Sequence, residues 1–182
     1  SLRYLSYSVQ DDSDSYYGDY QFLWTKVFFF TDRTILEVAQ SLKKKGGMKA
    51  LDNKLTKYHT LQFLSVEEIA SYESVQTHLK TLAKTICAKL GVYLENFEPF
   101  IDNYLNDWLF KGFSDETLVE IATYCFRNAN RSLEKMDNFV QNLYSQGVIS
   151  NQNFLNYQNN INNLDEEIKK IFSSLNIVEI VT

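Results

Sequence analysis

The chain has 182 residues, of which 45% are hydrophobic and 15% aromatic, and its formal net charge is −5. This length and composition suffice for one large or two small domains with a buried core. A single proline and six glycines favour long helices over sheets, so we predict an all-α protein. The longest purely apolar run, Val27 to Phe30, is far too short to span a membrane.

The two cysteines, Cys87 and Cys125, both fall inside helical patterns. We therefore expect buried free thiols in a reducing cytoplasm. At the two ends of the chain, residues 2–9 (LRYLSYSV) and 176–182 (NIVEIVT) have a strand-like composition. A short β pairing of these termini is compatible with their composition.

An internal repeat organises the sequence. The segment FTDRTILEVAQSL (30–42) recurs as FSDETLVEIATYC (113–125), at an offset of 83. After a length change in the next loop the match continues at an offset of 85, from Leu51, which aligns with Met136, to Leu90, which aligns with Leu175. Such a register implies a duplicated supersecondary unit, and we predict two tandem helical units, 1–93 and 94–182.

Each copy reads as a set of helices. Asp32 and Asp115 stand at helix starts, where we expect them to act as caps, and apolar residues follow at three- and four-residue spacing. Glycines and asparagines then break the chain before a second helix. Ser65-Val66-Glu67-Glu68 has the form of a capping box and predicts the start of a third helix.

One more helix is predicted between the copies, from Pro99 to about Phe110. Its stripe of Phe100, Tyr104 and Trp108 suits core packing better than base stacking, because the surrounding residues are acidic. The matching region before the first copy, YYGDYQFLWTKVFFF, aligns poorly. We therefore expect a weaker or remodelled leading helix there.

The sequence offers little for catalysis. His59 and His78 have no Cys or acidic partner at ligand spacing, so we expect no metal site and no cofactor. Asp115 and Glu116 have the chemistry of a general acid and base, but at a helix start they are more often cap and dipole partners. Glu116 is replaced by Arg33 in the other copy. We predict that the protein is not an enzyme.

Charge is distributed unevenly along the chain. Residues 40–90 hold nine lysines against four acids, whereas residues 91–130 hold two basic residues against seven acids. A basic region beside an acidic one can steer a polyanion to one face. The candidate DNA-binding residues are Lys43, Lys44, Lys45, Lys49, Lys54, Lys57, Arg127, Arg131 and Lys135. The alternative is that these side chains form an ordinary solvated surface.

The second copy resembles the DnaD-like domain of bacterial and phage replication-initiation proteins. The resemblance lies in DWLFKGFSDETLVEIATYC followed by RSLEKMDNFVQNLYSQGVIS, over residues 97–160. Through the repeat it extends more weakly to residues 30–92. One departure is that the family's YxxxIxxxW pattern, placed relative to Gly147, falls on Lys135, Phe139 and Leu143, without the terminal Trp.

This resemblance implies tandem DnaD-like domains and a non-enzymatic role in primosome assembly. Proteins of this family bind DNA and partner proteins, help to load the replicative helicase, and form oligomers. The expected partners are therefore single- or double-stranded DNA, a helicase or helicase loader, and a second copy of the chain. The alternative is a protein-interaction or oligomerisation module that does not bind DNA.

Overall fold

The computed structural model describes residues 14–43 and 45–175, with side chains from residue 18 onward. Within these ranges all regular secondary structure is helical and no strand occurs, which confirms the predicted all-α class. The two end segments with strand-like composition, 2–9 and 176–182, lie outside the described residues. No helix in the described part of the chain is both long and apolar enough to cross a membrane.

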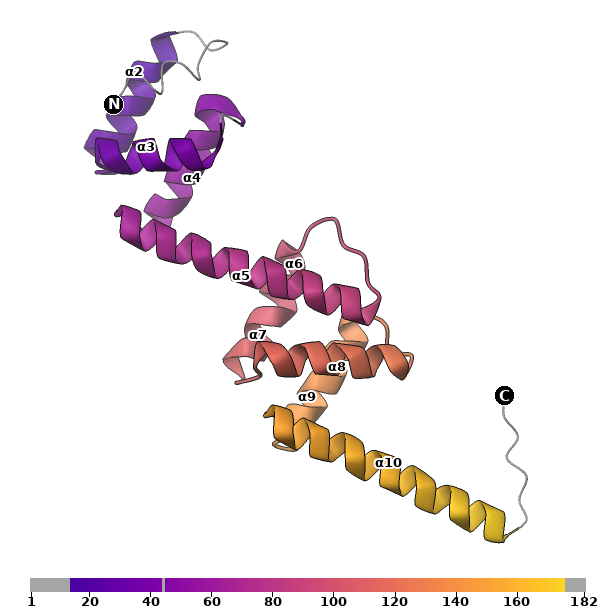
Figure 1. The fold of residues 1–182 in the computed structure, drawn as a ribbon. Coiled ribbons are helices and arrows are strands. Elements are labelled where there is room, and N and C mark those ends of the chain that lie inside the picture. Colours follow the sequence, from indigo (N-terminus) through magenta and orange to yellow (C-terminus); the bar gives the residue numbers. More distant parts are fainter. Residues whose placement is uncertain (1–13, 44, 176–182) are drawn as a thin grey trace. The chain divides into compact units, whose positions relative to one another are not determined.

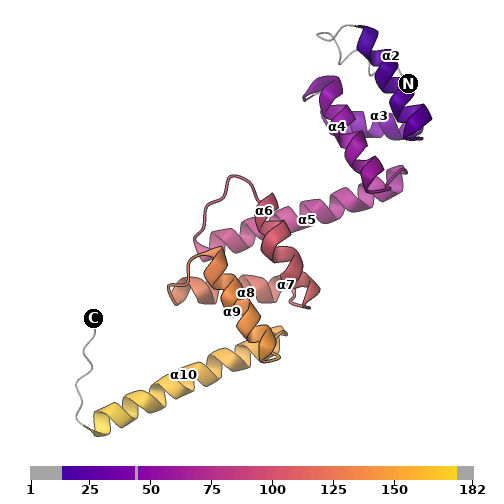
Figure 2. The same cartoon turned by 180° about the vertical axis from the view of Figure 1, so that it is seen from behind.

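The helices form two successive groups along the chain (Figure 1). The first group consists of α2 (Asp14–Phe22), the π-helix η1 (Leu23–Val27), α3 (Asp32–Ser41) and α4 (Gly47–Thr60). The long helix α5 (Val66–Leu90) follows. The second group consists of α6 (Glu98–Phe100), the π-helix η2 (Ile101–Leu105), α7 (Asn106–Phe110), α8 (Asp115–Arg127), α9 (Leu133–Ser145) and α10 (Asn151–Ser174). Figure 2 shows the same succession from behind.

The boundary between the two compact units lies inside α5. Among the described residues, one unit ends at Gln76 and the other begins at Thr77. The first half of α5 contributes Ile69 to the core of the first unit. Its second half contributes apolar residues to the core of the second unit. The division into units 1–93 and 94–182 was inferred from the alignment of the repeat, and it stays a prediction.

Each unit has its own hydrophobic core. The first core is built from Trp24, Phe30, Ile35, Val38, Met48, Leu51, Leu55, Tyr58 and Ile69. The second is larger, and α5 supplies it with Leu79, Leu82, Ala83, Ile86, Cys87 and Leu90. Burial of these apolar side chains is the main term that stabilises each unit.

A buried tryptophan is hydrogen-bonded in the same way in both units. Trp24 Nε1 donates to Asp52 Oδ1, and Trp108 Nε1 donates to Asp137 Oδ1, each at 2.8 Å. The indoles are 1% and 0% exposed, so each N–H needs an internal acceptor. The segment around Trp24, which we expected to be weaker or remodelled, therefore makes the same contact as its counterpart.

Helices α3 and α8 begin at Asp32 and Asp115, but the capping residue lies one position earlier. The hydroxyl oxygens of Thr31 and Ser114 each accept a hydrogen bond of 3.2 Å from the backbone N–H three residues later. The prediction that the aspartates are the caps is therefore wrong. They occupy the first helical position, where their charge still interacts favourably with the helix dipole.

The predicted capping box at the start of α5 is confirmed. Glu68 N donates to Ser65 Oγ at 3.2 Å, and the Glu68 carboxylate accepts from the backbone N–H groups of Leu64 and Ser65 at 3.0 and 3.3 Å. These backbone donors lower the pKa of Glu68 below its usual value. The helix then continues without interruption to Leu90, so that a single element serves both cores.

The leading helix of the second unit contains a π-turn. α6, η2 and α7 follow one another directly, and Pro99 occupies the first turn, where its missing N–H has no helical partner to lose. Phe100 and Trp108 are buried, with ring centroids 5.6 Å apart, and the partly buried Tyr104 lies beside both rings. The core-packing interpretation of this stripe is confirmed.

The turn before α3 has one residue more than the turn before α8. Phe30 N donates to Trp24 O, six residues earlier, at 2.9 Å. Phe113 N donates to Trp108 O, five residues earlier, at 3.2 Å. The residue at the end of each turn has a positive φ. It is Gly112 in the second unit, at 98°, and Phe29 in the first, at 63°.

We expect Phe29→Gly to raise the free energy of unfolding by about 0.5–1 kcal/mol, because a left-handed conformation costs a side chain more than it costs glycine. The Phe29 ring is 72% exposed, so little burial is lost. The reciprocal change Gly112→Ala should destabilise by about 1 kcal/mol from strain. A methyl group there would lie 3.6 Å from Ile149 Cγ2, an ordinary contact.

Urea denaturation followed by circular dichroism measures both effects. Gly18→Ala is the matched control, since Gly18 lies within α2 with open space around it. Alanine should stabilise that helix by up to about 1 kcal/mol. A destabilising Phe29→Gly would contradict the assignment of strain to this turn.

Candidate nucleic-acid interface

The candidate lysines of the first unit fall into two sets. Lys43, Lys45 and Lys49 are exposed around the loop that joins α3 to α4, and Lys43 itself has a positive φ of 49°. Lys44 lies outside the described residues. The exposed set stands beside the amino end of α4, where free backbone N–H groups also favour anions.

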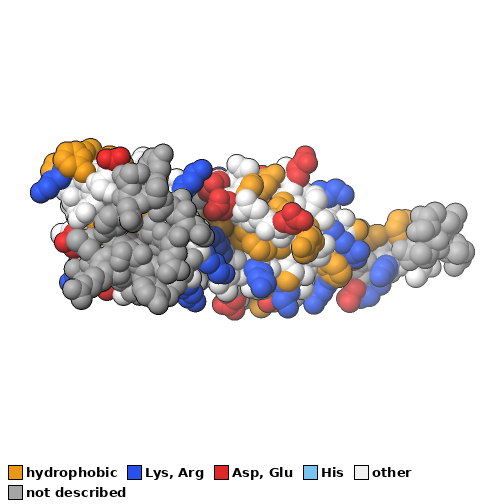
Figure 3. All heavy atoms as spheres, turned by 90° about the horizontal axis from the view of Figure 1, so that it is seen from above, with side chains coloured by type: hydrophobic (Ala, Val, Ile, Leu, Met, Phe, Trp, Pro, Cys, Tyr) orange, Lys and Arg blue, Asp and Glu red, His pale blue; other side chains and the backbone are white. Residues whose placement is uncertain are grey.

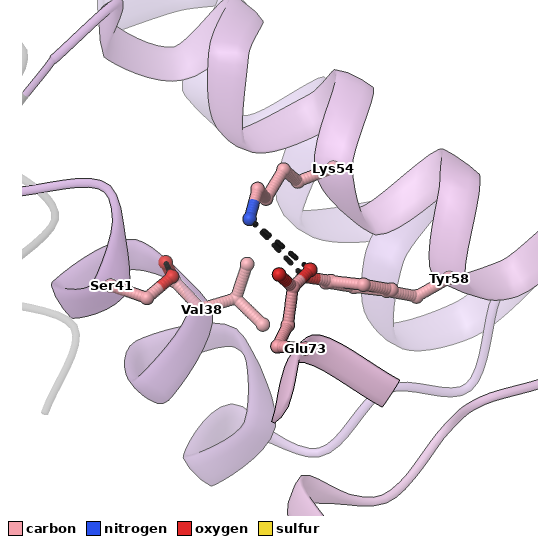
Figure 4. A network of polar contacts seen from close by, with 5 residues as sticks. All are labelled: Val38, Ser41, Lys54, Tyr58 and Glu73. Atoms are coloured by element: carbon pink, nitrogen blue, oxygen red, sulfur yellow. Dashed lines mark hydrogen bonds and ion pairs between the residues drawn. The ribbon is translucent and has the colours of Figure 1, made fainter. Parts of the chain in front are cut away.

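Lys54 and Lys57 have internal contacts instead. Lys54 Nζ lies 3.4 Å from Glu73 Oε1 and 3.3 Å from the Tyr58 hydroxyl (Figure 4). The Tyr58 hydroxyl donates to the same carboxylate oxygen. Lys57 Nζ lies 5.4 Å from the centre of the Tyr72 ring, within range of a cation–π interaction. These two amines therefore interact with neighbouring side chains in their own unit.

The Tyr58–Glu73 contact shifts both pKa values. Desolvation by burial, followed by the hydrogen bond to Glu73, raises the pKa of Tyr58 well above its usual range. Desolvation of Glu73 opposes ionisation, but the hydrogen bond from Tyr58 and the charge of Lys54 outweigh it and lower its pKa. Beside this network lies a pocket of about 180 Å³, with Val38 in its wall.

Because the pKa of Glu73 is lower in the folded chain, its contribution to stability is present at neutral pH and is lost as pH falls below about 4. We expect Glu73→Gln to remove this part of the acid dependence. Its side chain is 39% exposed, so solvent screening keeps the effect below about 1 kcal/mol. Urea unfolding at pH 3 to 7 measures the change, with the exposed Glu67→Gln as control. An unchanged pH profile would contradict the assigned role.

The candidate residues of the second unit flank its corresponding loop, between α8 and α9. Arg127 is exposed in the last turn of α8, and Lys135 is exposed in the first turn of α9. Arg131 lies in the loop, with its guanidinium 4.2 Å from the centre of the Phe126 ring and its Nε donating to Phe126 O at 3.0 Å. Each unit therefore carries basic residues at the same connection between helices.

Acidic and basic side chains are intermixed at the surface. On the face shown in Figure 3, Lys and Arg are interspersed with Asp, Glu and apolar groups rather than gathered in one patch of a single sign. Binding of a polyanion to such a surface depends on local groups of lysines and is reduced strongly by salt.

The two histidines lie in different settings. His78 Nε2 is 2.6 Å from Asp115 Oδ2, and the two side chains are 61% and 44% exposed. His59 stacks on Phe28, with ring centroids 4.1 Å apart, and its buried Nδ1 has no hydrogen-bond partner in the described ranges. Among residues 14–43 and 45–175, no three His, Cys, Asp or Glu side chains gather as a metal site would require.

Both cysteines are free and buried, as predicted. Burial raises the pKa of the Cys87 thiol to about 11 and that of the Cys125 thiol to about 12. A thiol with such a pKa is almost entirely protonated at neutral pH, so neither cysteine has the character of a nucleophile.

Sequence reasoning missed the contacts that the structure adds to this interface. The Tyr58–Glu73–Lys54 network has no equivalent in the second unit. In the alignment of the repeat, Phe139 corresponds to Lys54 and Gln158 corresponds to Glu73. Phe139 instead stacks in a cluster with Tyr124, Phe154 and Tyr157.

No family model, curated protein or solved structure matches this chain significantly.

Proposed function

We propose that this chain is a non-catalytic cytoplasmic adaptor that binds DNA and partner proteins in the initiation of DNA replication. The observation that carries the DNA-binding part is the exposed set Lys43, Lys45 and Lys49 around the α3–α4 loop. Exposed ammonium groups on a connecting loop can reach phosphates at little desolvation cost.

Contact with the phosphate backbone is independent of base sequence, so the proposed binding is of the nonspecific kind. The formal net charge of −5 opposes the approach of DNA to the molecule as a whole. We therefore expect weak binding, with a dissociation constant on the order of 10⁻⁵ M at moderate salt. The assignment to replication, with a helicase or helicase loader as partner, rests on the DnaD-like sequence of residues 97–160.

Fluorescence anisotropy with single- and double-stranded oligonucleotides between 50 and 200 mM salt tests the DNA-binding part. A plot of log affinity against log salt should have a slope of about −0.9 per neutralised phosphate of duplex DNA. The triple variant K43Q/K45Q/K49Q should bind more weakly and have a slope shallower by up to about 3.

The matched control is K80Q/K84Q/K89Q, which removes three lysines of α5 that are also exposed. Equal loss in the two variants would mean that total charge, and not the α3–α4 loop, governs binding. No detectable binding at 50 mM salt would refute a direct role of this chain in contacting DNA.

A second candidate function is a protein-interaction module that does not bind DNA. The observation that favours it is the set of exposed apolar side chains along the second half of α10. Self-association without DNA affinity in the same titrations would support this candidate over the first.

A further inference from the structure

The second half of α10 carries an apolar stripe that no described residue covers. Its side chains follow three- and four-residue spacing and are 40–62% exposed. They are Leu164, Ile168, Ile171 and Phe172 of α10, and Leu175 directly after its end. Exposed apolar side chains grouped on one helix face commonly mark an interaction surface.

The matching stripe on α5 shows what such a surface packs against. At the repeat offset of 85, the counterparts of the α10 residues are Leu79, Ala83, Ile86, Cys87 and Leu90. All of them are at most 8% exposed, because they belong to the core of the second unit. There the stripe forms one wall of a helical core.

Within the second unit this half of α5 runs alongside α8 (Figures 1 and 2). His78 and Asp115 meet at one point, and a methyl group at Gly91 would lie 3.1 Å from the Phe126 ring at another. An open groove follows the two helices near the first point. It is lined by Thr81, Leu82 and Thr85 of α5 and by Glu116, Val119 and Glu120 of α8.

Helix α3 in the first unit is the counterpart of α8. Ala39 of α3, and Leu42 directly after its end, are partly exposed, whereas their counterparts Ala122 and Cys125 are fully buried. This side of α3 has the apolar character of a surface on which a helix packs.

The charges of the two surfaces are complementary. The α5 side of the groove consists of His78, Thr81, Leu82 and Thr85, and the counterparts of these residues on α10 are Asn163, Glu166, Glu167 and Lys170. The α8 side consists of Asp115, Glu116, Val119 and Glu120, and the counterparts of these residues on α3 are Asp32, Arg33, Leu36 and Glu37. With α10 placed on α3 as α5 lies on α8, the uncharged Asn163 takes the place of His78 beside Asp32, the two glutamates come near Arg33, and Lys170 comes near Glu37.

We propose that α10 of one copy of this chain docks along α3 in the first unit of a second copy. The contact is heterologous, since each chain offers α10 to one neighbour and α3 to another. Copies therefore add head to tail. Pairing of α10 with α10 would bury the same stripe, but it would leave the complementary charges of α3 unused.

Sedimentation or light scattering of the full chain at increasing concentration tests this proposal. We expect the mass to rise beyond that of a dimer, because a heterologous contact does not close after two copies. Ile171→Asp should weaken association roughly a hundredfold, since a charge would replace a buried apolar side chain. Arg33→Glu should weaken it roughly tenfold by placing like charges together.

Three further measurements separate this contact from other modes of association. The charge reversal E166R/E167R should weaken assembly alone and restore it when combined with Arg33→Glu. Arg127→Glu makes the same change of charge on the second unit and should leave the mass unchanged. A mixture of the Ile171→Asp and Arg33→Glu chains should form dimers and no larger species, because only one intact contact remains.

Glutamate is favourable in the first turn of a helix, so Arg33→Glu is compatible with folding, and circular dichroism checks each variant. A chain that is monomeric at all concentrations would overturn the proposal. So would a mass that stops at the dimer and is insensitive to Arg33→Glu, since that result indicates pairing of α10 with itself.

Discussion

Replacing Trp108 by alanine should lower the free energy of unfolding by about 3–5 kcal/mol, the usual cost of removing a large aromatic side chain from a core. The indole is fully buried and lies against Phe100, with ring centroids 5.6 Å apart. Its loss also deprives Asp137 of the indole N–H, which leaves Gln141 Nε2, at 3.0 Å, as its other donor. Urea denaturation followed by circular dichroism measures the loss.

Phe110→Ala provides the matched control for this variant. Phe110 lies two residues further along α7 and is 91% exposed, so its truncation should change the stability by less than about 0.5 kcal/mol. A second variant, Asp137→Ala, keeps the ring and removes only the acceptor. It should cost about 1–3 kcal/mol. Comparable effects of Trp108→Ala and Phe110→Ala would contradict the placement of this tryptophan in the core.

Ile86→Ala should lower the free energy of unfolding by about 2–5 kcal/mol, because it leaves a cavity in the core of the second unit. The side chain is 0% exposed. Its counterpart in the repeat, Ile171, is 57% exposed. At concentrations where the chain is monomeric, Ile171→Ala should therefore change stability by less than about 0.5 kcal/mol.

This pair of variants compares the same residue at the same register position of two related helices. The measurement is urea unfolding of dilute protein, repeated at high concentration for Ile171→Ala. A large cost of Ile171→Ala in the dilute chain would mean that the α10 stripe is buried within the monomer. A small cost of Ile86→Ala would place α5 outside the core.

The helices were predictable because apolar spacing and breaking residues are local properties of a sequence. The region around Trp24 aligned poorly in the sequence because its turn differs in length. Its turn to Phe30 spans six residues, whereas the turn from Trp108 to Phe113 spans five, so the offset of the repeat changes within the turn. An alignment at a single offset does not match Trp24 with Trp108, although the two indoles make equivalent hydrogen bonds, to Asp52 and to Asp137.

The contacts of the candidate interface could not be predicted in the same way. Lys54 and Glu73 are separated by 19 residues, and only the packing of α4 on α5 brings them together. The contact of Arg131 with the Phe126 ring depends on how the loop after α8 turns. Sequence composition identifies basic residues, but tertiary packing decides which of them remain available to a ligand.

The copies of the sequence repeat and the compact units have different boundaries, because helix α5 belongs to one copy of the repeat but to both units. In the sequence the first copy continues to Leu90, yet the compact units divide between Gln76 and Thr77. The boundary between the compact units therefore lies near the middle of α5, whereas the first copy of the repeat continues to the end of this helix. A fragment cut at the repeat boundary would therefore deprive the second unit of one wall of its core and would leave that wall exposed on the first. Any dissection of this chain into independent pieces has to retain α5 in both.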